Sequence, residues 1–162
     1  MPVPDYFEFL GLPRKLNLDP ADLQRRFYAL SRELHPDRFS RAPVEERERA
    51  LSASAVLNDA YRTLRDPISR AEYLLGGTGG AEQPPPELVE EVFEANEALA
   101  DSDAGEIAAA RERFSALLAE TEAALPVLFA RYDAGDSAAE DIRAELGRRR
   151  FLKKLIERLD NV

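Results

Sequence analysis

The chain has 162 residues, a formal net charge of −9, one histidine and no cysteine. Without cysteine it cannot form disulfides, hold a cluster or a zinc ion through thiolates, or use a cysteine nucleophile. Residues 1–80 carry 12 basic and 12 acidic side chains, whereas residues 81–162 carry 10 and 19, so the negative excess lies in the second half. Because phosphate contacts need a basic surface, general nucleic-acid binding is not expected.

The N-terminal residues contain no recognisable targeting signal. Residues 1–5 lack the basic region and apolar core of a secretory signal, and they are not rich in arginine and serine like a transit peptide. No apolar run approaches the roughly 20 residues that span a bilayer. We therefore expect a bacterial-type cytoplasmic protein with one domain or two small ones.

The first predicted elements are two helices that end in a polar corner. Asp5 can cap a short helix that runs to Leu10. Asp19 can cap a longer helix with proline at its first position. Apolar residues recur along this helix at helical spacing: Leu23, Phe27, Leu30 and Leu34. Pro36 lacks an amide hydrogen and disfavours helical backbone at His35, so the helix should end there.

This corner places His35, Asp37 and Arg38 on an exposed turn that Pro36 stiffens. Three side chains with hydrogen-bonding groups on a stiff turn are suited to recognition of another protein. The polar face of the preceding helix leads to the same turn and carries Arg25, Tyr28 and Arg32. On composition alone, these arginines fit an ordinary solvated helix face, and the adjacent corner favours a docking face instead.

A third helix is predicted from Val44 to Leu64, antiparallel to the second in an αα-hairpin. Its apolar side is formed by Leu51, Val56, Leu57, Ala60, Tyr61 and Leu64. A short helix from Ile68 to Leu75 follows and should stop at Gly76. Residues 1–75 then form the first domain, and the glycine- and proline-rich residues 76–86 form a linker.

Residues 87–162 are predicted to form an antiparallel bundle of three helices, which makes the whole fold all-α. The first runs from about Pro86 to Ala100. The second starts at Asp103 with Glu106 as an acidic capping box, and Pro126 should kink or interrupt it. Its apolar stripe is Ile107, Phe114, Leu118, Leu125, Phe129 and Tyr132. The third starts at Ser137, with Glu140 completing a capping box, and runs to about Leu159.

Two phenylalanines in this bundle lie off the predicted core faces. The core face of the first bundle helix is Leu88, Val92, Ala95 and Leu99, and that of the third is Ile142, Leu146, Leu152, Ile156 and Leu159. Phe93 lies outside the first face, with Val89 beside it, and Phe151 lies nearly opposite the third. A wide apolar stripe that packs inside the protein is one explanation. A docking patch rimmed by carboxylates is the other.

The chain resembles a J-domain protein in several segments. These are Asp5-Tyr6-Phe7, His35-Pro36-Asp37, Asn58-Asp59-Ala60-Tyr61-Arg62-Thr63-Leu64 and Asp66-Pro67-Ile68-Ser69-Arg70-Ala71-Glu72-Tyr73-Leu74-Leu75. The run Arg-Ala-Glu-Tyr-Leu-Leu makes it similar to the HscB family of iron–sulfur co-chaperones. The resemblance implies binding of a DnaK/HscA-type chaperone through His35, Pro36, Asp37, Arg25, Arg32 and Arg38. It also implies binding of an IscU-type scaffold protein through Val89, Glu90, Phe93, Glu94, Glu97, Asp101 and Phe151.

Two other functions remain open at this stage. The first is an enzyme with His35 and Asp37 as an acid–base pair, although no other catalytic group is near in sequence. The glycine run 76–80 lacks the lysine of a phosphate-binding loop, and one histidine without cysteines makes a poor metal site, so no cofactor or metal is expected. The second is a J-domain adaptor for a client other than the scaffold. We expect a co-chaperone and not an enzyme.

Overall fold

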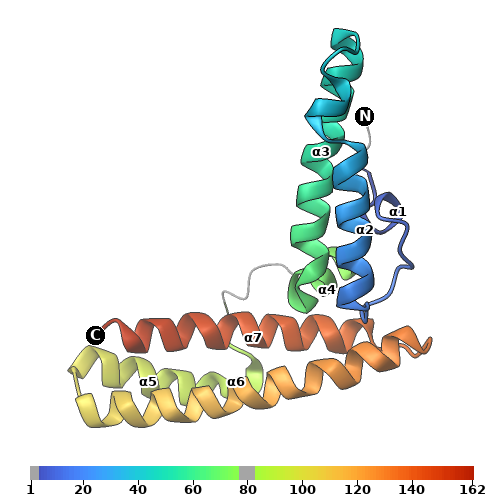
Figure 1. Ribbon diagram of the computed structural model, residues 1–162. Helices are drawn as coiled ribbons and strands as arrows, with labels where there is room; N and C mark the ends of the chain where they lie inside the picture. The colour runs from blue at the N-terminus through green and yellow to red at the C-terminus, as the bar shows by residue number, and fades with distance from the viewer. Residues whose placement is uncertain (1–3, 77–82) are drawn as a thin grey trace. The chain divides into compact units, whose positions relative to one another are not determined.

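A computed structural model describes residues 4–76 and 83–162. All regular structure in these ranges is helical, which confirms the predicted all-α class (Figure 1). The chain divides into two compact units, residues 1–76 and 77–162. Residues 77–82 of the predicted linker lie outside the described ranges, so the extents of linker and domains stay predictions. None of the helices in the described ranges has the length and apolarity needed to cross a membrane.

The first unit is a helical hairpin with two short flanking helices. Its elements are α1 (Tyr6–Phe9), α2 (Pro20–Glu33), the 3₁₀ helix η1 (Pro36–Phe39), α3 (Val44–Arg65) and α4 (Pro67–Leu75). Helices α2 and α3 lie side by side (Figure 1). Their facing sides and α1 enclose one apolar core, made of Phe7, Leu10, Leu12, Leu23, Leu57, Ala60 and Leu64. The predicted hairpin is therefore confirmed.

Two members of the predicted apolar side of α3, Leu51 and Val56, are not in this core. Leu51 is 67% exposed, and the neighbouring Ala50 is buried in its place. The expectation for Leu51 was wrong because α2 has already ended at Glu33, so the first turns of α3 face only the corner and not a partner helix. A helical wheel cannot show where the facing helix stops.

Local polar groups define the helix ends in this unit. The Asp19 carboxylate accepts a hydrogen bond from the backbone N–H of Ala21 at 3.0 Å, and Asp5 caps α1 in the same way through Glu8. Gly11 and Gly76 end α1 and α4 with φ angles of 67° and 61°, a region that glycine enters without steric cost. The predicted start of α2 at Asp19 is confirmed.

The second unit is the predicted three-helix bundle. Its elements are the 3₁₀ helix η2 (Pro86–Leu88), α5 (Val89–Asp101), α6 (Ala104–Asp133) and α7 (Ala139–Asp160). Ion pairs show that α6 and α7 run in opposite directions, because Arg111 pairs with Asp160 whereas Glu122 pairs with Arg149. The pKa of Arg111 is raised by its hydrogen bond to Asp160 and then by that carboxylate's charge.

The bundle core changes along its length because α5 is shorter than the other two helices. All three helices contribute to one cluster, formed by Leu88, Val92, Ala95, Ala98, Ile107, Phe114, Leu152, Leu155 and Leu159. Past the N-terminal end of α5 the core continues between α6 and α7 with Leu125, Phe129, Ile142 and Leu146. Leu155, which the predicted core face omitted, is only 2% exposed, whereas Ile156 is partly buried.

Three predicted helix boundaries in the bundle need correction. Helix α6 continues through Pro126, so the alternative that proline interrupts it was wrong. The Ser137 capping box was also wrong, because α7 begins after Ala138, which is fully buried and makes no side-chain cap. Residues Pro86–Leu88 form a 3₁₀ turn, so α5 begins at Val89 and not at about Pro86. The Asp103 cap is confirmed by hydrogen bonds from Gly105 and Glu106.

Candidate chaperone and scaffold docking surfaces

The turn between α2 and α3 is exposed to solvent. Pro36 starts η1, and the Asp37 side chain is 92% exposed while that of His35 is 57% exposed. The His35 Nδ1 atom accepts a hydrogen bond from the Asp37 backbone N–H at 3.2 Å, and Arg38 N–H donates to the His35 carbonyl at 3.0 Å. The backbone of the turn is thus held internally, and the Asp37 carboxylate is left for a partner.

The hydrogen bond at Nδ1 defines what the imidazole can do. A ring nitrogen that accepts a bond carries no proton, so the neutral ring has its proton on Nε2 and can donate from there. The Asp37 Oδ2 atom lies 3.6 Å from Nδ1. The two side chains form an ion pair only when the imidazole ring is protonated. Both side chains are largely exposed to solvent, and the residues that the structure describes contain no cluster of three or more metal-ligating side chains. This geometry suits a contact surface better than an enclosed acid–base pair.

A cationic groove runs from this turn along α2. It has a volume of about 860 Å³ and is lined by Arg25, Tyr28, Ser31, Arg32, His35 and Arg38. The predicted chaperone-binding residues Arg25, Arg32, Arg38 and His35 therefore lie together in one groove. Pro36 lines a separate depression with Leu34, Phe39 and Leu51, and Asp37 lines neither.

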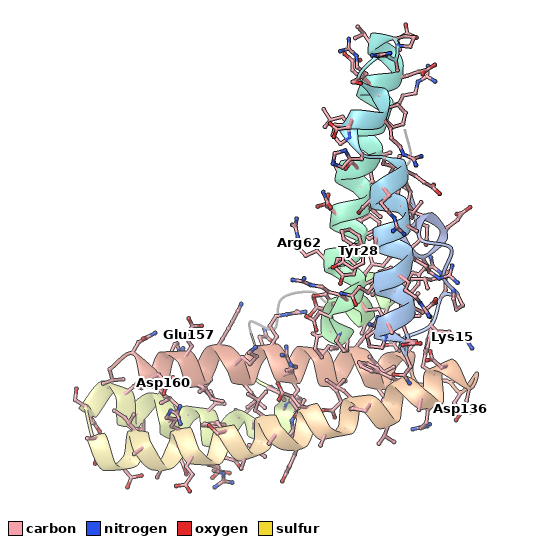
Figure 2. The ribbon with its side chains drawn as sticks, in the orientation of Figure 1. Lys15, Tyr28, Arg62, Asp136, Glu157 and Asp160 are labelled. Atoms are coloured by element: carbon pink, nitrogen blue, oxygen red, sulfur yellow. The ribbon has the colours of Figure 1, made fainter. Side chains whose placement is uncertain are left out.

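The sequence-based site omitted two residues of the groove. Tyr28, which is 54% exposed, was placed on the polar face but not in the site (Figure 2). Ser31 was not considered. The signal for Tyr28 was available, because it is separated from Arg25 by three residues and from Arg32 by four, the spacing of one helix face.

The outer face of α5 carries the predicted scaffold-binding residues of that helix. Val89 and Phe93 are 51% and 61% exposed, although both are apolar. Four carboxylates on the same side are also exposed: Glu90, Glu94, Glu97 and Asp101. The opposite side of α5 is buried in the bundle core. An exposed apolar pair with an acidic surround is typical of a protein-docking patch.

Phe151 does not share this exposure, and the expectation that it points away from the core was wrong. Its side chain is half-buried and packs against the core of the bundle. It lines a groove of about 350 Å³ with Pro84, Val92, Asn96, Lys154, Leu155 and Arg158. The prediction failed because the buried face of α7 shifts where α5 joins the bundle, which brings Phe151 to the α5–α7 boundary.

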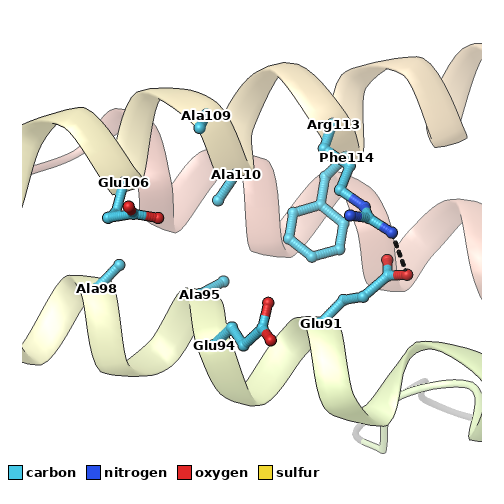
Figure 3. A pocket seen from close by; sticks show the side chains of 9 residues that line it. All are labelled: Glu91, Glu94, Ala95, Ala98, Glu106, Ala109, Ala110, Arg113 and Phe114. Atoms are coloured by element: carbon cyan, nitrogen blue, oxygen red, sulfur yellow. Dashed lines mark hydrogen bonds and ion pairs between the residues drawn. The ribbon is translucent and has the colours of Figure 1, made fainter.

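A small cavity lies on another side of α5, where it packs against α6. Figure 3 shows the side chains that line it: Glu91, Glu94, Ala95, Ala98, Glu106, Ala109, Ala110, Arg113 and Phe114. An ion pair between Arg113 and Glu91 closes one end (Figure 3). Of the predicted scaffold-binding residues only Glu94 lines it, and it shares no residue with the Phe151 groove. The cavity therefore does not join the predicted residues into one site.

Comparisons with known proteins match both units. The DnaJ domain family matches residues 5–73, and the HSCB C-terminal oligomerisation domain family matches residues 84–160. Among solved structures, the chaperone HscB from Vibrio cholerae is 31% identical with a TM-score of 0.65, over 98% of this chain and 96% of that one. The human co-chaperone protein HscB is 26% identical with a TM-score of 0.69, over 99% of this chain and 83% of that one.

Curated relatives align with less than half of this chain. The co-chaperone protein HscB of Proteus mirabilis is 41% identical over 75 residues, which are 46% of this chain and 43% of that protein. A co-chaperone protein HscB homolog of Vibrio cholerae is 47% identical over 75 residues, which are 46% of this chain and 44% of that protein. The aligned chain thus spans less than half the length of these curated relatives.

Proposed function

Because the chain belongs to the HscB family of J-domain co-chaperones, we propose that it stimulates the ATPase of a DnaK/HscA-type chaperone and delivers an IscU-type scaffold to it during iron–sulfur cluster assembly. The first unit binds the chaperone and the second unit binds the scaffold, in the bacterial cytoplasm. The protein itself catalyses no reaction. The observation that carries this proposal is the exposed His35-Pro36-Asp37 turn at the end of a cationic groove.

The chaperone contact is supported by the charge distribution around the turn. The groove contributes three arginines, and the turn contributes one exposed carboxylate. A partner with a complementary acidic surface would be steered to the arginines over distances of about a Debye length. The Asp37 carboxylate would then form a charge-assisted hydrogen bond with a cationic group of the chaperone. The Asp37 carboxylate is thus the group on the turn that an arginine or lysine side chain of the chaperone can recognise.

The test of the chaperone contact is the rate of ATP hydrolysis by a purified DnaK/HscA-type chaperone in single turnover. Wild-type protein should accelerate it, and Asp37→Asn should abolish the acceleration with an unchanged unfolding temperature, because the side chain is 92% exposed. The matched control is Asp59→Asn, which removes another partly exposed carboxylate of the first unit, outside the groove. Full stimulation by Asp37→Asn would refute the role of the turn.

The scaffold contact is supported by the exposed apolar side chains on α5 and by their acidic surround. Apolar side chains at the centre of a patch supply most of the affinity, and the charged rim contributes orientation and association rate. Capture of an IscU-type scaffold by wild type and its loss in Phe93→Ala plus Phe151→Ala would support iron–sulfur delivery. Val127→Ala is the control, because Val127 is 62% exposed on α6, away from this patch.

The same experiment addresses the alternative of a J-domain adaptor for another client. Undiminished capture of the scaffold by the double variant would exclude the proposed patch, and no capture by wild type would favour a different client. Unfolding temperatures are needed for Phe151→Ala, since the side chain is half-buried in the bundle. Turnover of a substrate by the isolated protein that depends on His35 would revive the enzyme hypothesis.

A further inference from the structure

The groove between α5 and α7 combines an apolar floor with a cationic bank. Phe151, Leu155 and Val92 supply the apolar surface, and Lys154 and Arg158 supply the charges. Lys154 and Arg158 follow Phe151 by three and seven residues, so all three lie on one side of α7. The sequence-based scaffold site contained no cation, so these two residues add a chemical group that it lacked.

Most arginines of the bundle form ion pairs within the bundle, and Lys154 and Arg158, the cationic bank of the groove, differ from them. Arg148 pairs with Glu87, Arg149 with Glu122 and Arg113 with Glu91. Within the described ranges, by contrast, no carboxylate lies within ion-pair distance of Lys154 or Arg158.

Arg158 donates to the Asn96 side-chain oxygen at 2.7 Å, which uses one of its five N–H donors and holds the guanidinium at the groove. Seven of the ten basic side chains of residues 81–162 lie between residues 143 and 158, so α7 is locally basic within an acidic half of the chain.

The acidic face of α5 lies across the same apolar strip. Val92 and Asn96 line the groove, and Val89 and Phe93 are their neighbours around the helix. The carboxylates of Glu90 and Glu97 come next around α5. From α7 to α5 the surface therefore changes from cationic through apolar to acidic. A segment bound across it meets opposite charges on its two sides.

We propose that Lys154 and Arg158 are specificity-determining residues that bind a carboxylate on the docking segment of the scaffold. The proposal rests on the function proposed above and names the chemistry of that partner. The segment carries an acidic side chain toward α7, an apolar side chain against Phe151 and a basic side chain toward α5. Charges of opposite sign on the two banks penalise binding in the reversed orientation, because each bank would then meet a like charge.

The test compares two adjacent lysines. Lys154→Glu and Lys153→Glu change the net charge equally, both side chains are exposed, and only Lys154 lines the groove. Titration calorimetry with a purified IscU-type scaffold should show Lys154→Glu binding about 10- to 100-fold more weakly, as expected for a lost hydrogen bond to a charged group. Lys153→Glu should remain within about twofold of wild type, as expected for an exposed charge outside the contact.

Compensating substitutions in the scaffold distinguish a direct contact of Lys154 with the scaffold from an indirect effect of Lys154→Glu on the structure of the bundle. Replacing acidic residues of the scaffold one at a time with lysine should identify one variant that restores binding to Lys154→Glu while weakening binding to wild type. If wild type binds the scaffold, the proposed function stands. Equal losses of affinity in Lys154→Glu and Lys153→Glu, or no loss in either variant, would then overturn the inference alone. Failure of wild type to bind would overturn the proposed function itself. Self-association of wild type that Lys154→Glu abolishes would assign the groove to a second copy and refute the inference.

Discussion

The Nδ1 atom of His35 accepts a hydrogen bond from the backbone N–H of Asp37, at a distance of 3.2 Å. The histidine side chain thereby caps the short helix η1, in the way that aspartate or asparagine caps an α-helix. The same residue has an exposed side chain, so it serves the local backbone with one nitrogen and can meet a partner with the other. These two roles can be separated by substitution.

His35→Asn should preserve the turn and lose the partner contact. Asparagine can accept the hydrogen bond from the Asp37 N–H, but its side chain has no group at the position of Nε2. His35→Ala loses the cap as well, which should lower the free energy of unfolding by about 1 kcal/mol. We therefore expect both variants to lose stimulation of the chaperone ATPase, whereas only His35→Ala unfolds more readily in urea. Wild-type stimulation by His35→Asn would show that the imidazole has no role beyond capping.

Arg70→Met should destabilise the first unit strongly. The guanidinium is 4% exposed and donates to the carbonyl of Leu64 at 2.7 Å and to that of Leu16 at 2.6 Å. Methionine leaves both buried carbonyls without these donors, at a cost of about 1–3 kcal/mol for each group. Urea unfolding monitored by circular dichroism measures the loss. The control is Arg62→Met, an arginine whose side chain is 72% exposed, and it should stay close to wild type.

Glycine substitutions should change stability with opposite signs at two positions. Gly11 has a φ angle of 67°, and an added Cβ would lie 3.0 Å from the Arg26 Nη1 atom. Gly11→Ala should therefore lower stability by at least about 1 kcal/mol, the usual cost of a left-handed conformation in a residue with a Cβ. Gly147 lies inside α7 with no atom within 4 Å of such a Cβ.

Gly147→Ala should raise stability by up to about 1 kcal/mol, because alanine loses less backbone entropy in a helix. Thermal unfolding of both alanine variants under the same conditions compares the two effects. A gain in Gly11→Ala would contradict the steric argument.

Pro126→Ala should stabilise the bundle. Helix α6 continues through this proline, which removes the hydrogen bond that an N–H at position 126 would donate to the Glu122 carbonyl. Alanine restores the donor, with a gain of up to about 3 kcal/mol. Val127→Ala is the control for a substitution at this point of α6. Val127 is 62% exposed, so truncation of its side chain should change stability little. An unchanged or lower unfolding temperature for Pro126→Ala would mean that the bundle requires the local geometry that proline imposes.

The helices and the docking turn could be predicted from the sequence because short-range chemistry controls them. Pro36 forbids helix continuation, Asp19 and Asp103 supply caps, and Gly76 permits a left-handed end. These effects act within a few residues, and local sequence contains all of their partners. The family resemblance came from residues in the same segments, which is why the first unit was described more completely than the bundle.

Sequence by itself determined the all-α class, the order of the helices and the position of the exposed turn. Only the tertiary structure decided which side of α7 is buried at each level. Leu146 and Leu152 are both buried, yet six residues separate them, which breaks the three- or four-residue spacing of one helix face. The buried face shifts because α7 first packs against α6 alone and then also meets α5. A helical wheel assumes one partner along the whole helix, so it could not place Phe151, Lys154 and Arg158 together at the α5–α7 groove.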